Sequence, residues 1–308
     1  MAGVRIVKHW FRYLLYASLL FLAVALYKAN YLVLPRIYSP SALAGSIALL
    51  FLGMFCEPIS WKAILDKSGH PAGFRECFAA VGLSMFAKYI PGKIWAIVGR
   101  AGYVAEKRSH SLGALTSITV TWQFILLWVG LVFGACGLML LGKILLWGWP
   151  ILFLWLGLTT VIFSDAAQSL ARRAYKKVLG REIAIPRLSI RSTVAALPWF
   201  VLMWLFLSGG FYLLVVGLSP HHVPLSVGLG FPMTVTLGVF AVFAPAGIGV
   251  REGAMVGYLA LAGFPTQDAA AVSITARLWY LLGEVFMFVV GLAANAAVKR
   301  AEITRARP

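Results

Sequence analysis

Long apolar runs separated by short polar and basic stretches form the dominant pattern of the chain. Six runs are long enough for a helix to cross a bilayer, which takes about 20 residues. Four further apolar stretches form two pairs, and most of them are too short to span. The pattern predicts an all-α membrane protein whose full spans cover about residues 13–34, 41–65, 112–141, 144–163, 194–218 and 269–298, with broken helix pairs at 78–89 with 93–104 and at 225–243 with 250–262.

Proline and glycine interrupt both helix pairs. The first break is Pro91-Gly92, and the second contains Pro245, Gly247 and Gly249. Proline disfavours helix at the residue before it, and glycine permits turns that strain other residues. Broken helices occur at membrane depth where the backbone is buried in protein or lines a wet cavity, and matching breaks in two halves indicate a transport site. A tight loop between two spans is the alternative for either stretch.

The charges predict the topology. Only 12% of residues are charged, whereas soluble domains have about 25%, and the net charge is +17. The cations flank the apolar runs, which is typical of topology signals and anionic-lipid contacts and not of nucleic-acid binding. The positive-inside rule places the N-terminus, the basic loop 165–191 and the C-terminus in the cytoplasm. The first helix pair then opens inward and the second outward, an inverted arrangement of halves 10–164 and 192–298 within one membrane domain. Loop charge alone also allows each pair to cross twice.

Residues that could hold a metal or perform catalysis are sparse. Cys56, Cys77 and Cys136 lack metal-type spacing and are expected to be small core residues. The pair His221-His222 is a weak metal signal. Nucleophile-elbow, zinc-protease and diphosphate-binding aspartate motifs are missing from the sequence, so we expect no catalytic residue, no metal and no cofactor.

Charged residues at membrane depth are the candidate functional residues, because each costs free energy there. Arginine matches phosphate with paired hydrogen bonds, and helix N-termini favour anions. We therefore expect a cationic cavity that binds a lipid headgroup, and a net charge near +2 for Lys93, Arg100, Arg251 and Arg277 together with Glu252 and Glu284. Its expected residues are Lys88, Lys93, Arg100, Arg251, Glu252, Arg277 and Glu284, while Glu57 is a further carboxylate at this depth. The alternative is that Arg251–Glu252 and Arg277–Glu284 are structural ion pairs.

Two motifs resemble those of a known family. Tyr-Ile-Pro-Gly-Lys-Ile-Trp at 89–95, followed by Gly99-Arg100, and Pro-Ala-Gly-Ile-Gly-Val-Arg-Glu-Gly at 245–253 are similar to the flippase-like family that includes the transmembrane region of lysylphosphatidylglycerol synthases. The resemblance covers about residues 10–298. It is to the flippase part, without the soluble aminoacyl-transferase domain, because the sequence ends at Pro308 directly after the last span.

The resemblance implies lipid translocation in a bacterial inner membrane. The expected partner is an anionic or polyprenyl-type lipid, and envelope glycosyltransferases are a further candidate partner. Two alternatives from other classes stay open: a membrane-embedded enzyme of lipid or glycan modification, and a non-catalytic scaffold for envelope glycosyltransferases. A paired-acid site with room for a nucleotide would favour the enzyme, and a fully packed interior would favour the scaffold.

Overall fold

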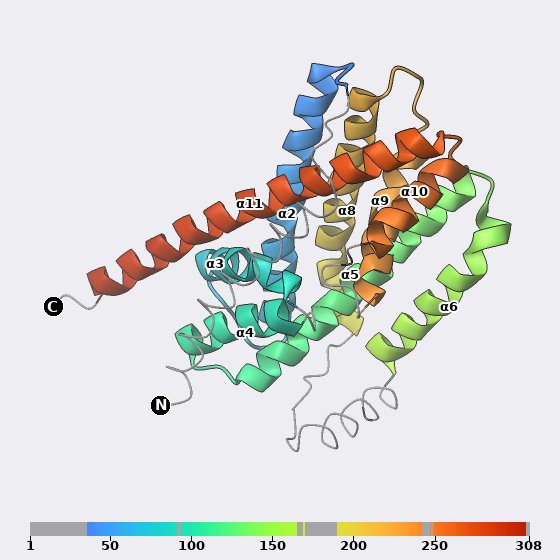
Figure 1. Cartoon of the computed structure of the whole chain (residues 1–308). Helices are drawn as coiled ribbons and strands as arrows, with labels where there is room; N and C mark the ends of the chain where they lie inside the picture. Colours follow the sequence, from blue (N-terminus) through green and yellow to red (C-terminus); the bar gives the residue numbers. More distant parts are fainter. Residues whose placement is uncertain are drawn as a thin grey trace.

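The computed structural model describes residues 36–90, 94–164, 169, 190–241, 247 and 249–305. The predicted span 13–34, together with Pro91, Gly92, Lys93 and Pro245, lies outside the described residues. The described elements are α2 (Pro40–Lys67), α3 (Phe74–Ser84) with its 3-10 continuation η1 (Met85–Tyr89), α4 (Ile94–Arg108), α5 (Leu112–Leu140), α6 (Ile144–Phe163), α8 (Ile190–Leu218), α9 (Ser226–Phe240), α10 (Val250–Leu261) and α11 (Thr266–Arg305) (Figure 1).

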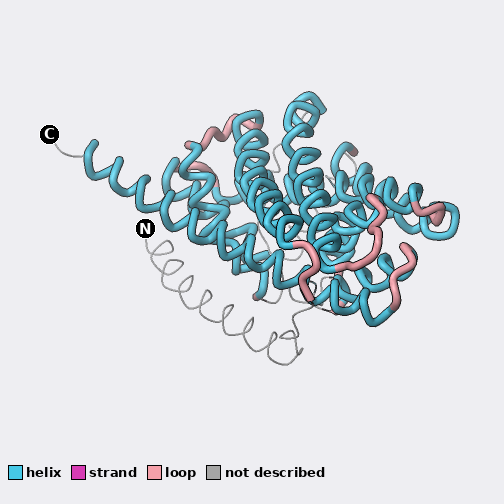
Figure 2. The backbone as a smooth tube through the Cα atoms, turned by 90° about the horizontal axis from the view of Figure 1, so that it is seen from above, coloured by secondary structure: helices cyan, strands magenta, loops and turns pink. Residues whose placement is uncertain are grey.

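The all-α membrane class is confirmed. The described residues contain helices and loops and no strand (Figure 2). Within them, five helices are long and apolar enough to cross a membrane: α2, α5, α6, α8 and α11. The starts of α2 and α5 follow ordinary capping rules, since the Ser39 and Ser111 hydroxyls accept hydrogen bonds from the backbone N–H groups of Ala42 and Ala114.

Helices α2 and α8 form a close antiparallel pair in the middle of the bundle (Figure 1). The Tyr38 N–H donates to the Gly217 carbonyl at 2.8 Å, which joins the beginning of α2 to the end of α8. Farther along, a Cβ added at Gly53 would lie 2.8 Å from the Leu207 side chain. Small residues let helix backbones approach closely, and this close packing holds membrane helices together in place of the hydrophobic effect.

The remaining helices repeat one packing scheme in both halves. Helix α3 packs on α11 and α9 packs on α5, while α4 lies on α5 and α10 on α11. Glycines permit the closest contacts: a Cβ at Gly82 would lie 2.6 Å from the Gly291 Cα, and one at Gly134 would lie 2.6 Å from the Met233 Cβ. Exchanging α2–α5 with α8–α11 thus maps each of these contacts onto another.

The two helical hairpins, α3–α4 and α9–α10, enter from opposite ends of the bundle. The base of the first is joined by Arg108 Nε and Glu76 Oε2 at 2.8 Å, beside the end of α2. The base of the second is joined by the Tyr258 hydroxyl, which donates to the Ser226 carbonyl at 2.7 Å, and the Tyr258 ring lies against Gly230. That base follows the end of α8, where α2 begins. Opposite entry is what an inverted repeat requires.

One prediction about the core was wrong. Cys56 and Cys77 are buried, but Cys136 is exposed on α5. Its apolar neighbours in sequence did not place it in the core, because a membrane helix is apolar on its lipid-facing side too.

Helix α6 stands at the edge of the bundle against α5, where Trp128 and Trp155 stack with ring centroids 5.2 Å apart (Figure 1).

Candidate functional site

Buried charged side chains gather where the two hairpins approach each other between α2 and α11. Arg100, Arg251 and Arg277 are 6%, 7% and 5% exposed, and Glu284 is 1% exposed. We call the whole group the polar cluster; its cations are Lys88, Arg100, Arg251 and Arg277, and its carboxylates are Glu57, Glu252 and Glu284.

A chain of contacts links the ends of the two breaks. Glu284 on α11 forms an ion pair with Lys88 Nζ at 2.8 Å and accepts a hydrogen bond from the Tyr89 hydroxyl at 2.6 Å. Arg277 Nη2 donates to the Tyr89 oxygen at 3.3 Å, and Arg277 Nε lies 3.9 Å from Glu252 Oε1, beyond hydrogen-bond range. Tyr89 is the last residue of η1 before the first break, and Glu252 is in the first turn after the second. The flanks of the two breaks are therefore close together.

Glu252 is held in place by the start of α10. The Gly249 N–H donates to Glu252 Oε2 at 2.7 Å, and Gly249 has φ +86°, a conformation that glycine adopts without strain. This carboxylate caps the helix and complements its dipole. Its other oxygen, Oε1, is buried without a hydrogen-bond partner and faces Arg277.

Arg251 has aromatic neighbours in place of a carboxylate. Its guanidinium carbon lies 4.5 Å from the Tyr280 ring centre and 4.9 Å from the Phe231 ring centre. Nη2 is buried without a hydrogen-bond partner, and Arg251 forms no ion pair with any carboxylate in the described part of the chain. The alternative of an Arg251–Glu252 ion pair is not seen among the described residues, where the arginine lies against two aromatic rings.

Arg100 forms the other part of the polar cluster. Its Nη2 donates to Glu57 Oε1 at 2.9 Å, while Nε and Nη1 are buried without partners. The guanidinium lies 4.9 Å from the Trp122 ring centre and 5.9 Å from that of Trp61. Both indoles are fixed by hydrogen bonds between α2 and α5, from Trp61 to Thr119 and from Trp122 to Ser60. Arg100 therefore has a counter-ion but also spare donors.

The described conformation is closed around these groups. A cavity lined by Arg251, Glu252, Ser273 and Arg277 measures about 10 Å³, close to the minimum for one water molecule. A lipid headgroup is much larger than one water. Binding it between these side chains therefore requires the hairpins to separate.

The structure gathers most of the residues that the sequence singled out. Five of the predicted site residues lie together in the contacts described above: Lys88, Arg251, Glu252, Arg277 and Glu284. Arg100 pairs with Glu57, whose carboxylate interacts electrostatically with Lys88. Among the described members four cations face three carboxylates, an excess of one positive charge; the expected charge near +2 counted Lys93, which lies outside the described residues. The same expectation left out Lys88 and Glu57.

Sequence reasoning missed the aromatic and hydroxyl partners. Tyr89 links Arg277 to Glu284, and Phe231 and Tyr280 enclose Arg251. Of these three aromatic residues, only Tyr280 could have been suspected from the sequence, because it lies between Arg277 and Glu284 on α11. Glu57 had been noted as a carboxylate at membrane depth, but only the packing of α2 against α4 and α5 shows which cation it serves.

Comparison with known proteins gives one match. A family model described as the lysylphosphatidylglycerol synthase TM region matches residues 9–291. Comparisons with curated proteins and with solved structures find no match. The matched range contains both hairpins and every residue of the polar cluster. By this match over nearly its whole length, the chain belongs to the family of lysylphosphatidylglycerol synthase transmembrane regions.

Proposed function

We propose that this multi-pass membrane protein translocates an anionic, phosphate-bearing lipid across a bacterial inner membrane. The observation that carries the proposal is Arg251, a guanidinium only 7% exposed, with a buried donor left unpaired and no carboxylate of the described residues bound to it. A phosphate oxygen is the acceptor that such a group accommodates best.

The energetics favour an anionic ligand. A cation at the centre of a membrane helix costs about 2.5–3.5 kcal/mol on insertion scales. Contacts with aromatic faces are worth about 2 kcal/mol or more when they are desolvated. The rings of Phe231 and Tyr280 therefore offset most of the cost of Arg251, but neither ring gives its buried Nη2 a hydrogen-bond acceptor, which a bound anion would supply. The single excess positive charge of the polar cluster favours the same ligand.

The architecture supports movement of that ligand. The two hairpins enter from opposite ends, and the described residues that flank their breaks come together at the polar cluster through Tyr89, Arg277 and Glu252. Separating one hairpin from the long helices would open the cluster to one leaflet, and separating the other would open it to the opposite leaflet. The closed cavity of about 10 Å³ then corresponds to the state between the two.

The basic end of the bundle supports the proposed orientation. The ends of α2, α4 and α11 carry Lys67, Lys107, Arg108, Lys299 and Arg300, and the positive-inside rule assigns this end to the cytoplasm. We further propose that the protein acts as a transporter and not as an enzyme, since its charged residues are used in pairs or enclosed by aromatic rings.

Transport in vesicles tests the proposal. The purified protein is reconstituted with fluorescent phosphatidylglycerol, phosphatidylcholine or a polyprenyl phosphate, and lipid reaching the inner leaflet is measured by its protection from a membrane-impermeant quencher. We expect movement of an anionic probe but not of phosphatidylcholine. Arg251→Gln should reduce the initial rate at least tenfold, because the unpaired donor fork is lost.

The matched control is Arg108→Gln, which removes an arginine paired with Glu76 at the bundle end. It should keep most of the rate. Normal transport by Arg251→Gln would refute the phosphate site, and equal movement of phosphatidylcholine would refute selection of anionic lipids. Comparing the phosphatidylglycerol and polyprenyl arms identifies the lipid class.

A further inference from the structure

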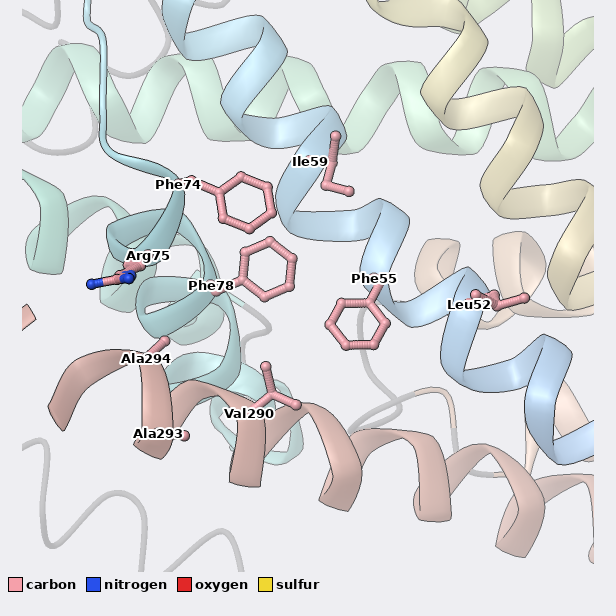
Figure 3. A pocket seen from close by; sticks show the side chains of 9 residues that line it. All are labelled: Leu52, Phe55, Ile59, Phe74, Arg75, Phe78, Val290, Ala293 and Ala294. Carbon is pink, nitrogen blue, oxygen red and sulfur yellow. The ribbon is translucent and has the colours of Figure 1, made fainter. Parts of the chain in front are cut away.

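A groove lies outside the polar cluster. It measures about 440 Å³, within the range of ligand sites, and lies between α2, α3 and α11. Figure 3 shows the rings of Phe55, Phe74 and Phe78 facing this space together with Val290, while the Arg75 guanidinium points away at its edge. Apart from Arg75, every lining residue is apolar.

We propose that this groove binds one acyl chain of an anionic phospholipid from the cytoplasmic leaflet, with the lipid phosphate held by Arg75. The inference rests on the proposed function and adds to it a docking site for the substrate and the leaflet from which it comes. Lipid tails are as apolar as the lining, so tail burial alone gives no preference over bulk bilayer. Selection must therefore come from the charge at the mouth.

Arg75 is available for a phosphate. It forms no ion pair with another described residue, whereas its neighbour Glu76 is bound to Arg108 at 2.8 Å. Arg75 lies at the basic end of the bundle, at the level where headgroups of the cytoplasmic leaflet would lie. A juxtamembrane cation favours anionic lipid about fivefold.

The chain's own N-terminal stretch fits this groove less well than a lipid does. Its apolar run is preceded by Arg5, Lys8 and Arg12, which the predicted topology places at the cytoplasmic surface. Packing that run in the groove would bring these cations toward Arg75. An anionic headgroup attracts Arg75, so charge complementarity selects the lipid.

All three helices of the groove carry or lead to members of the polar cluster. Glu57 lies on α2 between the lining residues Phe55 and Ile59, Val290 lies six residues from Glu284 on α11, and α3 continues into η1, which holds Lys88. Phe286 of α11 packs on Phe55 with ring centroids 5.4 Å apart. A lipid whose tail occupies the groove therefore lies against the helices that carry the cluster.

Photo-crosslinking tests the docking site without requiring transport. The full chain is reconstituted in phosphatidylcholine vesicles with a trace of phosphatidylglycerol or phosphatidylcholine that carries an acyl-chain diazirine, and labelled peptides are mapped by mass spectrometry. We expect phosphatidylglycerol to label residues 74–78 and 290–294 about fivefold more than phosphatidylcholine does. Arg75→Gln should abolish this preference, and Arg108→Gln should keep it.

Two tryptophan substitutions on α11, one inside the groove and one outside it, test whether filling the groove displaces the lipid. Ala293 lines the groove and Ala296 lies one turn farther along α11, and both are exposed. Ala293→Trp should reduce labelling at 74–78 severalfold, whereas Ala296→Trp should not. Equal labelling by the two lipids, or normal labelling of Ala293→Trp, would overturn the proposal.

A photoreactive residue at position 74 shows whether the groove holds a lipid or the N-terminal stretch of the chain. A crosslink from position 74 to residues 1–35 in place of lipid would also overturn the proposal. Arg251→Gln should label as the unchanged protein does. Loss of groove labelling with transport still dependent on Arg251 would therefore refute only the groove, and the reverse pattern would refute only the transport site.

Discussion

Replacing Glu284 by glutamine should destabilise the protein more than replacing it together with Lys88. Glu284 is 1% exposed and accepts from Lys88 Nζ at 2.8 Å and from the Tyr89 hydroxyl at 2.6 Å. Glu284→Gln keeps the shape of the side chain but leaves the Lys88 ammonium without its counter-ion.

The size of the effect follows from burial. Removing one partner of a buried ion pair costs about 3–5 kcal/mol. Lys88 is still 29% exposed and keeps some hydration, so we expect the lower end, about 3 kcal/mol. Lys88→Met combined with Glu284→Gln removes one charge of each sign, so it adds no uncompensated charge, and it loses hydrogen bonds worth about 1 kcal/mol. The double variant should therefore be about 2 kcal/mol more stable than Glu284→Gln alone.

Unfolding of the purified variants in mixed micelles, followed by helix content against denaturant, measures this difference. Lys88→Met alone completes the double-mutant cycle. If the double variant is less stable than Glu284→Gln, the two side chains do not act as a pair and the reasoning fails. Glu284→Gln should also slow lipid transport, because Tyr89 would donate to a neutral amide oxygen, a weaker acceptor than the carboxylate that orients it toward Arg277.

Further predictions concern packing, pH and topology. Gly82→Ala places a Cβ against the backbone of α11 and should cost about 1–3 kcal/mol in unfolding assays, whereas Gly257→Ala meets nothing within 4 Å and should be neutral or stabilising. Burial opposes ionisation of Glu76, but hydrogen bonds from Arg108 and the backbone hold its pKa below the ordinary 4.5. Its contribution to the free energy of unfolding should therefore be present above pH 4.5 and be lost as the pH falls below that value. Glu76→Gln should remove this pH dependence, and an unchanged dependence of stability on pH would contradict the assignment. His221→Cys, in a chain whose native cysteines are replaced, should react with an impermeant thiol reagent added outside intact cells. If the cysteine does not react, the predicted topology is inverted.

Helix positions were predictable because membrane helices follow from length and hydropathy. The α5 and α6 boundaries lie within a residue of those expected, at Leu112–Leu140 and Ile144–Phe163. The last span was underestimated, since α11 continues to Arg305 through a polar stretch. Hydropathy ends there, but ion pairing such as Lys107 with Glu302 at 2.7 Å supports further helical turns.

Partners of the charged residues were less predictable, because pairing depends on contacts between helices far apart in sequence. Spacing on one helix suggested Arg277 with Glu284, but Lys88 from η1 pairs with Glu284 in the structure. Likewise Arg251 follows the second break as expected, yet its neighbours Phe231 and Tyr280 come from α9 and α11. The sequence identified which charges lie at membrane depth, while tertiary packing decided which of them are neutralised.

The two hairpin bases differ in a way that gives the molecule a salt-sensitive end and a salt-resistant end. Arg108–Glu76 and Lys107–Glu302 join the first base through partly exposed ion pairs, which dissolved ions screen over about 8–10 Å. The second base is joined by the Tyr258 ring packed on Gly230, and ionic strength has little effect on such contacts. Added salt should therefore speed amide hydrogen exchange at the ends of α3 and α4 while leaving α9 and α10 unchanged. The cytoplasmic electrolyte would then set how readily one side of the bundle opens.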